Sequence, residues 1–206
     1  MRSYQDPCGI ARALDRVGER WALLVVRELL LGPRRFTDLR AGLPSASPNV
    51  LSQRLRELED AGVVQRRALP PPVAATVYEL TPRGRELEAV LVSLARWGSR
   101  AVPRPQGELS PSALMIALRT TFDPGALSRG RLAVVLDGEP FSVEIACGAL
   151  SVARGEPEAP DATITTTARA LRAVVFAGHE PRGVEIAGDA ALATRFLGAF
   201  ARPAPA

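Results

Sequence analysis

Four polar side chains stand close together in the stretch "SPNVLSQRLRELEDAGVV", residues 47–64: Asn49, Ser52, Gln53 and Arg56. An Asn or Gln amide can pair bidentately with adenine and an Arg guanidinium with guanine, because their donors and acceptors match the base edges. The same residue types are common on any exposed helix face. The elements around them therefore decide whether the four side chains read DNA or only face solvent.

The start of this stretch predicts a helix that holds the polar group on one side. The hydroxyl of Ser47 suits an N-cap, and Pro48 suits the first helical position, where no backbone donor is needed. At about 100° per residue, three apolar residues fall within a narrow arc and predict the buried face: Leu51, Leu55 and Leu58. Asn49, Gln53 and Arg56 then cluster opposite, with Ser52 on one flank.

The residues before this helix predict a helix-turn-helix. "CGIARALDRVG" places Ile10, Leu14 and Val17 at helical spacing, and "RWALLVVRELLLG" predicts a second core helix that stops at Gly32 and Pro33. A short helix from about Phe36 to Gly42, with Phe36 and Leu39 facing inward, precedes a Pro/Ser turn. Two helices joined by a short turn are the pattern that enters the DNA major groove.

The residues after it predict a wing and a long closing helix. Residues 63–69 and 75–81 are β-prone runs joined by "PPPVA", with Arg66 and Arg67 on or beside the hairpin. Thr81 and Pro82 then open a helix. Its apolar stripe is longer than a small domain can cover, so we expect part of it to pair with another subunit: Leu87, Val90, Leu91, Leu94 and Trp97.

The inventory of reactive side chains argues against an enzyme. All 26 basic residues are arginine, which excludes a Walker lysine and a Schiff-base lysine. The single histidine, His179, lies in a loop signal and excludes HExxH metal binding, and no GxSxG elbow accompanies it. Cys8 and Cys147 are too few for a disulfide scaffold or a cysteine zinc site. We expect no metal and no cofactor; an enzyme using carboxylates alone stays as an alternative.

The charge is placed unevenly along the chain. Residues 1–100 hold 16 Arg against 11 Asp and Glu, a net charge of +5, whereas residues 101–206 hold 10 against 11, a net charge of −1. The first half is therefore the candidate for a polyanionic partner. The alternative is that these arginines only solvate exposed faces.

Composition and a Pro- and Gly-rich segment predict two soluble domains. The chain has 206 residues, 47% of them hydrophobic, and no run approaches the roughly 18 apolar residues of a membrane span. The charged start "MRSYQDPCGIARALDR" does not fit a signal peptide, so we expect a cytoplasmic protein without membrane contact. "VPRPQGELSP", residues 102–111, looks like a linker, which predicts domains at 1–102 and 103–206.

The second region predicts an α/β sandwich with a mainly antiparallel sheet, so the whole chain is α+β. Alternation through residues 132–136, 141–147 and 150–152 indicates a meander whose turns fall at Asp137-Gly138 and Cys147-Gly148, with Cys147 itself expected in the core. "DATITTT" and "GVEIAG" indicate two more strands. Three helices should cover the apolar face, near 112–121, 168–177 and 189–200.

Three stretches of the first region resemble the HxlR family of bacterial transcriptional regulators, relatives of the MarR family. They are "CGIARALDRVGERWALLVVRELLLGPRRFTDLR", "SPNVLSQRLRELEDAGVVQRR" and "YELTPRGRELEAVL". The resemblance implies a homodimer, built from the first and last helices, that binds double-stranded DNA at a pseudo-palindromic site.

Two positions depart from the family pattern. The wing tip "LPPPVAA" carries no charge, so phosphate contacts would fall to four other residues: Arg34, Arg35, Arg66 and Arg67. Asn49 stands where many relatives carry a lysine, so a target sequence cannot be transferred.

Cys8 matches the N-terminal cysteine of the HxlR family, and the resemblance implies a redox role. Its place near a helix start and close to Arg12 would lower its pKa and favour the thiolate. The alternative, which we favour, is a small buried residue at the dimer seam.

The second region is similar to the end of sterol carrier protein two-like domains in "PDATITTTARALRAVVFAG" and "GVEIAGDAALATRFLGAF". The resemblance spans about residues 108–201 and implies an apolar tunnel for a hydrophobic small molecule. Its expected lining is Leu114, Met115, Leu118, Phe122, Phe141, Phe176 and Phe196. The alternative is that these side chains only fill a core.

Together the patterns predict a homodimeric DNA-binding regulator, expected to be a repressor, that a hydrophobic effector in the second domain modulates. The alternative is a carrier of lipids or hydrophobic ligands whose winged helix contacts other proteins.

Overall fold

The computed structural model describes residues 4–72, 74–100 and 107–200. The chain divides into two compact units, Met1–Leu91 and Val92–Ala206. This division lies inside helix α6 (Leu87–Gly98), whereas the domain boundary predicted at 102/103 lies in residues 101–106, outside the described residues. Among the described residues, no helix combines the length and the apolar character that a membrane crossing requires.

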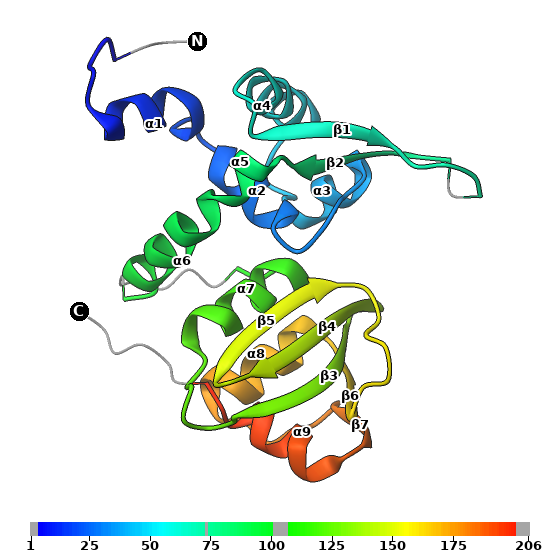
Figure 1. Ribbon diagram of the computed structural model, residues 1–206. Helices are drawn as coiled ribbons and strands as arrows, with labels where there is room; N and C mark the ends of the chain where they lie inside the picture. The colour runs from blue at the N-terminus through cyan, green and yellow to red at the C-terminus, as the bar shows by residue number, and fades with distance from the viewer. Residues whose placement is uncertain (1–3, 73, 101–106, 201–206) are drawn as a thin grey trace. The chain divides into compact units, whose positions relative to one another are not determined.

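The first unit is a winged helix-turn-helix, as predicted (Figure 1). Its elements follow in the order α1 (Gly9–Val17), α2 (Ala22–Leu29), α3 (Phe36–Gly42), α4 (Pro48–Asp60), β1 (Val64–Ala68), β2 (Thr76–Leu80) and α5 (Pro82–Arg85), and then α6. The helix predicted from Thr81 is interrupted at Glu86 and comes as two, α5 and α6.

The predicted caps of α4 and α5 are confirmed. The Ser47 hydroxyl accepts a hydrogen bond from the backbone N–H of Val50, and Thr81 does the same for Gly84 at 3.0 Å. α4 ends where Gly62 adopts φ +69°, a conformation that costs glycine little and turns the chain directly into β1. The helix that carries the polar group is thus defined at both ends by its own residues.

The core of the first unit forms around the predicted leucines of α4. Leu51, Leu55 and Leu58 are at most 1% exposed and pack with Leu39 of α3, and Phe36 is half-buried against them. α1 differs from the prediction of a core helix: Val17 is buried, but Ile10 is 72% and Leu14 43% exposed. The physical reason is that within this unit no element covers the outer part of the α1 stripe.

The second unit holds a five-stranded mixed sheet of order β5-β4-β3-β6-β7. Its strands are β3 (Arg129–Leu136), β4 (Glu139–Ala146), β5 (Ala149–Arg154), β6 (Ala162–Thr166) and β7 (Glu185–Gly188). The first three form the predicted antiparallel meander, and β7 is antiparallel to β6. β3 and β6 pair in parallel, from Leu132 with Ala162 to Leu136 with Thr166.

Three helices complete this unit: α7 (Pro111–Thr121), α8 (Ala168–Ala177) and α9 (Ala190–Leu197). α8 passes behind the sheet in Figure 1. Alternate residues of β3 and β4 are fully buried, whereas Glu144 and Ser151 on the opposite face are exposed. One face of the sheet therefore builds the core, as the alternation predicted, and the opposite face carries exposed polar residues.

Candidate functional site: the outer face of helix α4

The outer face of α4 presents the side chains predicted to read bases. Asn49, Gln53 and Arg56 are exposed and Ser52 is half-buried, on the side opposite the leucine stripe. Arg56 Nε donates to the backbone oxygen of Ser52 at 3.4 Å, and Asn49 makes no side-chain hydrogen bond with a described residue. The structure thus brings the four side chains together on one accessible surface of one rigid helix.

A carboxylate that the sequence analysis did not single out holds one of these side chains. Gln53 Nε2 donates to Glu57 Oε1 at 2.8 Å, one helical turn further along. Glu57 also forms an ion pair with Arg54, whose side chain is only 14% exposed and which reaches Glu19 at 3.6 Å. The i,i+4 spacing of Gln53 and Glu57 was the available signal in the sequence.

Arg66 and Arg67 both lie on β1, as predicted, and both are paired. Arg66 contacts Glu59 of α4 at 2.9 Å and its guanidinium lies over the Tyr78 ring, 5.3 Å from the centroid. Arg67 pairs with Glu79 of β2 at 2.9 Å. About half of each side chain remains exposed, so each can still offer N–H groups to a phosphate.

Arg34 occupies a different environment from the other predicted phosphate contacts. It is 9% exposed, its backbone bridges Tyr78 of β2, and its guanidinium lies 3.9 Å from the fully buried Glu28. Burial lowers the pKa of Arg34, and the nearby Glu28 carboxylate opposes that shift. Its side chain has little surface to offer a phosphate, and its position favours a structural role.

Arg35 is exposed at the start of α3, where its backbone N–H donates to Asp38 at 3.1 Å. Its guanidinium forms no ion pair within the described part of the chain. Of the four arginines predicted to contact phosphate, Arg35 is therefore the one whose guanidinium has no ion-pair partner among the described residues.

The tip of the wing lacks charge, as predicted: the described residues of "LPPPVAA" carry none, and Val73 lies outside them.

Cys8 is exposed at the N-cap of α1. The backbone N–H groups of Ile10 and Ala11 at the start of α1 lower the pKa of its thiol. Among the described residues of this unit, nothing provides the burial that we favoured from the sequence, so the dimer seam at α1 stays a prediction.

The predicted tunnel residues of the second unit lie in a packed core. Five of them are completely buried, Leu114, Met115, Leu118, Phe141 and Phe196, and two are half-buried, Phe122 and Phe176. Phe122 and Phe196 both pack against Phe200. The ring centroid of Phe200 lies 5.8 Å from that of Phe122 and 5.0 Å from that of Phe196. An open hollow of this unit, of about 810 Å³, has a lining that includes none of the seven. The tunnel and its ligand therefore remain predictions.

Two further positions complete the comparison with the sequence. The expectation that Cys147 belongs to the core is wrong, because the residue is exposed at φ +51° in the turn between β4 and β5. His179 lies in an exposed loop after α8, as predicted. Within residues 4–72, 74–100 and 107–200, no group of three or more His, Cys, Asp or Glu is placed to hold a metal ion.

Comparison with known proteins agrees with this geometry over the first unit. The family model described as "HxlR-like helix-turn-helix" matches residues 16–106. The curated transcriptional regulator Rv3095 of Mycobacterium tuberculosis is 43% identical over 98 residues, which are 48% of this chain and 61% of that protein. The chain thus spans less than two thirds of this relative's length.

A second relative is covered more fully. The curated regulator YvaP of Bacillus subtilis is 40% identical over 88 residues, 43% of this chain and 82% of that protein. A solved structure of the reduced regulator YodB from B. subtilis is 32% identical, with 47% of this chain and 96% of that chain covered and a TM-score of 0.42. From the family match and the identity with YvaP, which the chain covers to 82%, the chain belongs to the HxlR-like helix-turn-helix family.

Proposed function

We propose that this protein is a transcriptional regulator that binds double-stranded DNA through helix α4. The observation that supports this most directly is the shape of α4: its leucine stripe is buried, and Asn49, Gln53 and Arg56 project from the opposite face. Amide and guanidinium groups near the start of such a helix can reach base edges in the major groove. The curated relatives are named as transcriptional regulators, which supports the same function.

Arginines around α4 would anchor the phosphates. Arg35, Arg66 and Arg67 are accessible near the two ends of the helix-turn-helix, and residues 1–100 carry a net charge of +5. Contacts to phosphate fix the register of the protein on the duplex, whereas the base edges supply the sequence information. In this division of roles Arg34 is a structural residue.

The proposal includes a homodimer. α6 presents Val90, Leu94 and Trp97 at 53%, 45% and 76% exposure, and α1 presents Ile10 and Leu14. Apolar side chains repeated along one helix face are costly in water, so we expect a second copy to cover each face. A two-fold dimer would place two copies of α4 on a pseudo-palindromic operator, where the protein would act as a repressor.

A small-molecule effector would act through the second unit. It can change DNA binding only if it binds one spacing of the two α4 helices better than another. The names of the relatives support regulation of transcription. Control by a small-molecule effector is a further part of this proposal.

The test is fluorescence anisotropy with a labelled duplex from upstream of the protein's own gene, compared with unrelated DNA of equal length at several salt concentrations. We expect tighter, saturable binding to the first duplex, and loss of that preference in the Gln53→Ala/Arg56→Ala variant. Arg83→Ala, which removes an exposed arginine from α5, is the matched control.

Equal and salt-sensitive binding to both duplexes would mean that the arginines only attract phosphate. It would contradict sequence-specific binding of the upstream duplex by α4. Protein that ignores DNA and copurifies with lipid would support the carrier function in its place.

A further inference from the structure

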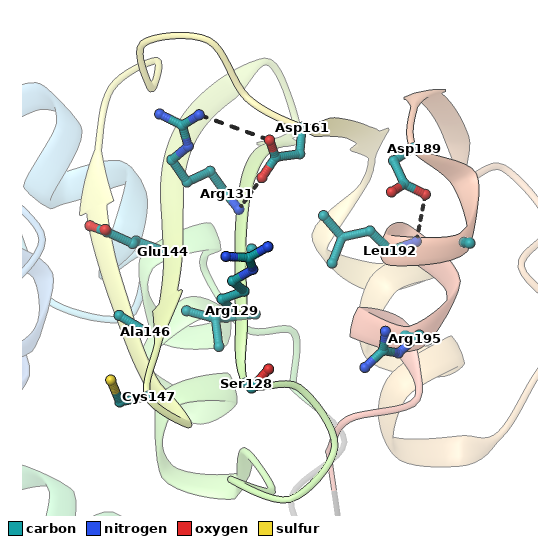
Figure 2. A pocket seen from close by; sticks show the side chains of 13 residues that line it. Ser128, Arg129, Arg131, Glu144, Ala146, Cys147, Asp161, Asp189, Leu192 and Arg195 are labelled. Atoms are coloured by element: carbon teal, nitrogen blue, oxygen red, sulfur yellow. Dashed lines mark hydrogen bonds and ion pairs between the residues drawn. The ribbon is translucent and has the colours of Figure 1, made fainter.

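A hollow of about 810 Å³ opens in the second unit beside the first residues of β3. It exists because β6 pairs with β3 only from Leu132 onward, so Arg129, Gly130 and Arg131 have no neighbouring strand on that side. α9 borders this gap (Figure 2). A volume of roughly 300–1,000 Å³ is typical of small-molecule sites.

The backbone around Asp161 fixes the upper wall of the hollow. Asp161 exchanges hydrogen bonds with Arg131: its carboxylate accepts from the Arg131 N–H and its own N–H donates to the Arg131 oxygen, both at 2.8 Å. The Asp161 oxygen accepts from the N–H of Asp189 at 2.9 Å. Gly188 allows this approach, because a Cβ there would lie 2.6 Å from that oxygen. The start of α9 is therefore tied to the start of β6.

Six charged residues line the hollow, and the three acids already have opposite charges or helix donors near them. Asp161 faces the Arg131 guanidinium at 3.9 Å, and Glu144 is the cross-strand neighbour of Arg131 in the β3–β4 register. The Asp189 carboxylate accepts from Leu192 N at 2.9 Å and caps α9. Asp161 and Asp189 are thus held by contacts within the fold, and Glu144 lies beside Arg131.

Two arginines of the lining remain without a carboxylate partner. Arg129 on β3 forms no described hydrogen bond or ion pair through its side chain, and Arg195 on α9 donates only to the backbone oxygen of Ala126, at 3.3 Å. Both side chains are exposed, and Figure 2 shows them on the β3 side and the α9 side of the hollow. Their free N–H groups suit a carboxylate or a phosphate, which an arginine can bind through two parallel hydrogen bonds.

An apolar surface lies beside the two arginines. Leu192 projects from α9 toward β3 in Figure 2, and a Cβ on Gly130 would lie 2.9 Å from its Cδ1. Leu192 therefore packs directly on the β3 backbone. Ala191 of α9 is exposed in the same lining, and Ile145, the β4 partner of Gly130, lies buried beneath it. A ligand that contacts the whole hollow needs both a charged head and an apolar body.

We infer that this hollow binds an organic anion, with its carboxylate or phosphate head between Arg129 and Arg195 and its apolar body along Leu192 and Ala191. The site differs from the predicted tunnel in place and in chemistry, since the tunnel residues are core residues and bear no cation. It does not depend on DNA binding by the first unit.

The test is isothermal titration calorimetry of the full chain with decanoate, decyl phosphate and decanol. We expect at least one of the two anions to bind, and decanol to bind about tenfold more weakly or not at all, because a charge-assisted hydrogen bond is lost. The Arg129→Gln/Arg195→Gln variant should weaken anion binding about tenfold or more. Arg169→Gln, at an exposed arginine of α8, should leave it unchanged. Comparison of the two anions identifies the preferred head group.

A second measurement locates the ligand without relying on the double variant. Cys147 lies on the rim of the hollow and is exposed. In a Cys8→Ser background, the bound anion should slow labelling of Cys147 by a maleimide. The proposal is overturned if neither anion binds, if decanol binds as well as the anions, if the double variant binds like the unchanged chain, or if the bound anion leaves Cys147 labelling unaltered.

Discussion

Gln53 and Glu57 form a hydrogen bond of 2.8 Å along the outer face of α4, with the glutamine amide nitrogen as the donor. A carboxylate only accepts, so this contact determines which end of the amide faces Glu57. When the N–H trans to the amide oxygen makes this contact, the oxygen and the other N–H of Gln53 share the edge that is left for a base. They are the acceptor and donor that adenine matches with its N6 and N7 atoms.

This relationship predicts that Glu57 sets the base preference of Gln53. In a Glu57→Gln variant the new amide can donate or accept, so the Gln53 amide is free to turn. Selection from a randomised duplex library should show the adenine preference at one position of each half-site falling about tenfold, the loss expected of one bidentate pair. Overall affinity should be kept, because no phosphate contact is removed.

Glu59→Gln is the control, since it removes the same charge from the same helix but its partner is Arg66. Adding Glu57→Gln to Gln53→Ala should change the preference no further. A preference that is lost with Gln53→Ala but kept with Glu57→Gln would contradict positioning by Glu57 and leave base reading by Gln53 intact.

Glu28 should be among the most sensitive positions for the stability of the first unit. It is fully buried and pairs with Arg27 at 2.8 Å and with Arg34 at 3.9 Å. Glu28→Gln removes the buried carboxylate that faces the buried guanidinium of Arg34, at a cost of about 3 kcal/mol. Urea unfolding followed by tryptophan fluorescence measures this loss.

Two further variants separate the charge effect from a packing effect. Adding Arg34→Met to Glu28→Gln should restore part of the stability, because the buried guanidinium of Arg34 is then removed together with the carboxylate beside it. Gly42→Ala should destabilise the unit through the same group, since its Cβ would lie 2.6 Å from Glu28 Oε2. A Glu28→Gln variant as stable as the unchanged chain would show that the pair contributes nothing.

Cys8 should react as a thiolate at lower pH in the folded chain than in the unfolded chain. The N–H groups of Ile10 and Ala11 exist in this arrangement only when α1 is formed, and they hold the pKa of the thiol below its ordinary value of 9.0. In a Cys147→Ser variant, the iodoacetamide labelling rate should reach half its maximum at a lower pH in buffer than in urea. Folded protein that resists labelling at every pH would instead place Cys8 within a dimer seam.

Glu79 should make the wing sensitive to acid. Hydrogen bonds from Gln65, and then from Arg67, lower the pKa of Glu79 from 4.5. A carboxyl with a lowered folded-state pKa binds fewer protons when folded, so its stabilisation is complete above pH 4.5 and is lost as the pH falls through the lowered value. Unfolding midpoints of the unchanged chain and of Glu79→Gln should therefore differ above pH 4.5 and converge as the pH falls below it. Glu86→Gln is the control, and a gap that is constant with pH would contradict the prediction.

The elements that obey local rules could be predicted closely. Ser47 and Pro48 start α4 where capping chemistry requires it, and the 3.6-residue period identified its buried leucines. The limits of α3 and α8 also coincide with those expected. Each of these follows from residues less than about four positions apart, where sequence and structure are directly linked.

Features that depend on distant segments were missed. Arg34 is buried because β2 approaches it through Tyr78, and nothing near Arg34 in the sequence indicates that approach. Cys147 was placed in the core because alternation was extended through a residue that belongs to the turn. The hollow beside β3 depends on where β6 begins to pair, which is a matter of register between strands about 30 residues apart.

The parallel pairing of β3 with β6 also has a consequence for how the chain is made. Residues 132–136 of β3 emerge from the ribosome well before residues 162–166 of β6, and β7 and α9 follow later still. Synthesis runs from the N-terminus and domains fold as units, so Met1–Leu91 can bury its core while the second sheet is incomplete. Each nascent chain should therefore have a formed α4 before its ligand hollow exists. For that interval, new protein would be beyond the control of any effector that acts through the second unit.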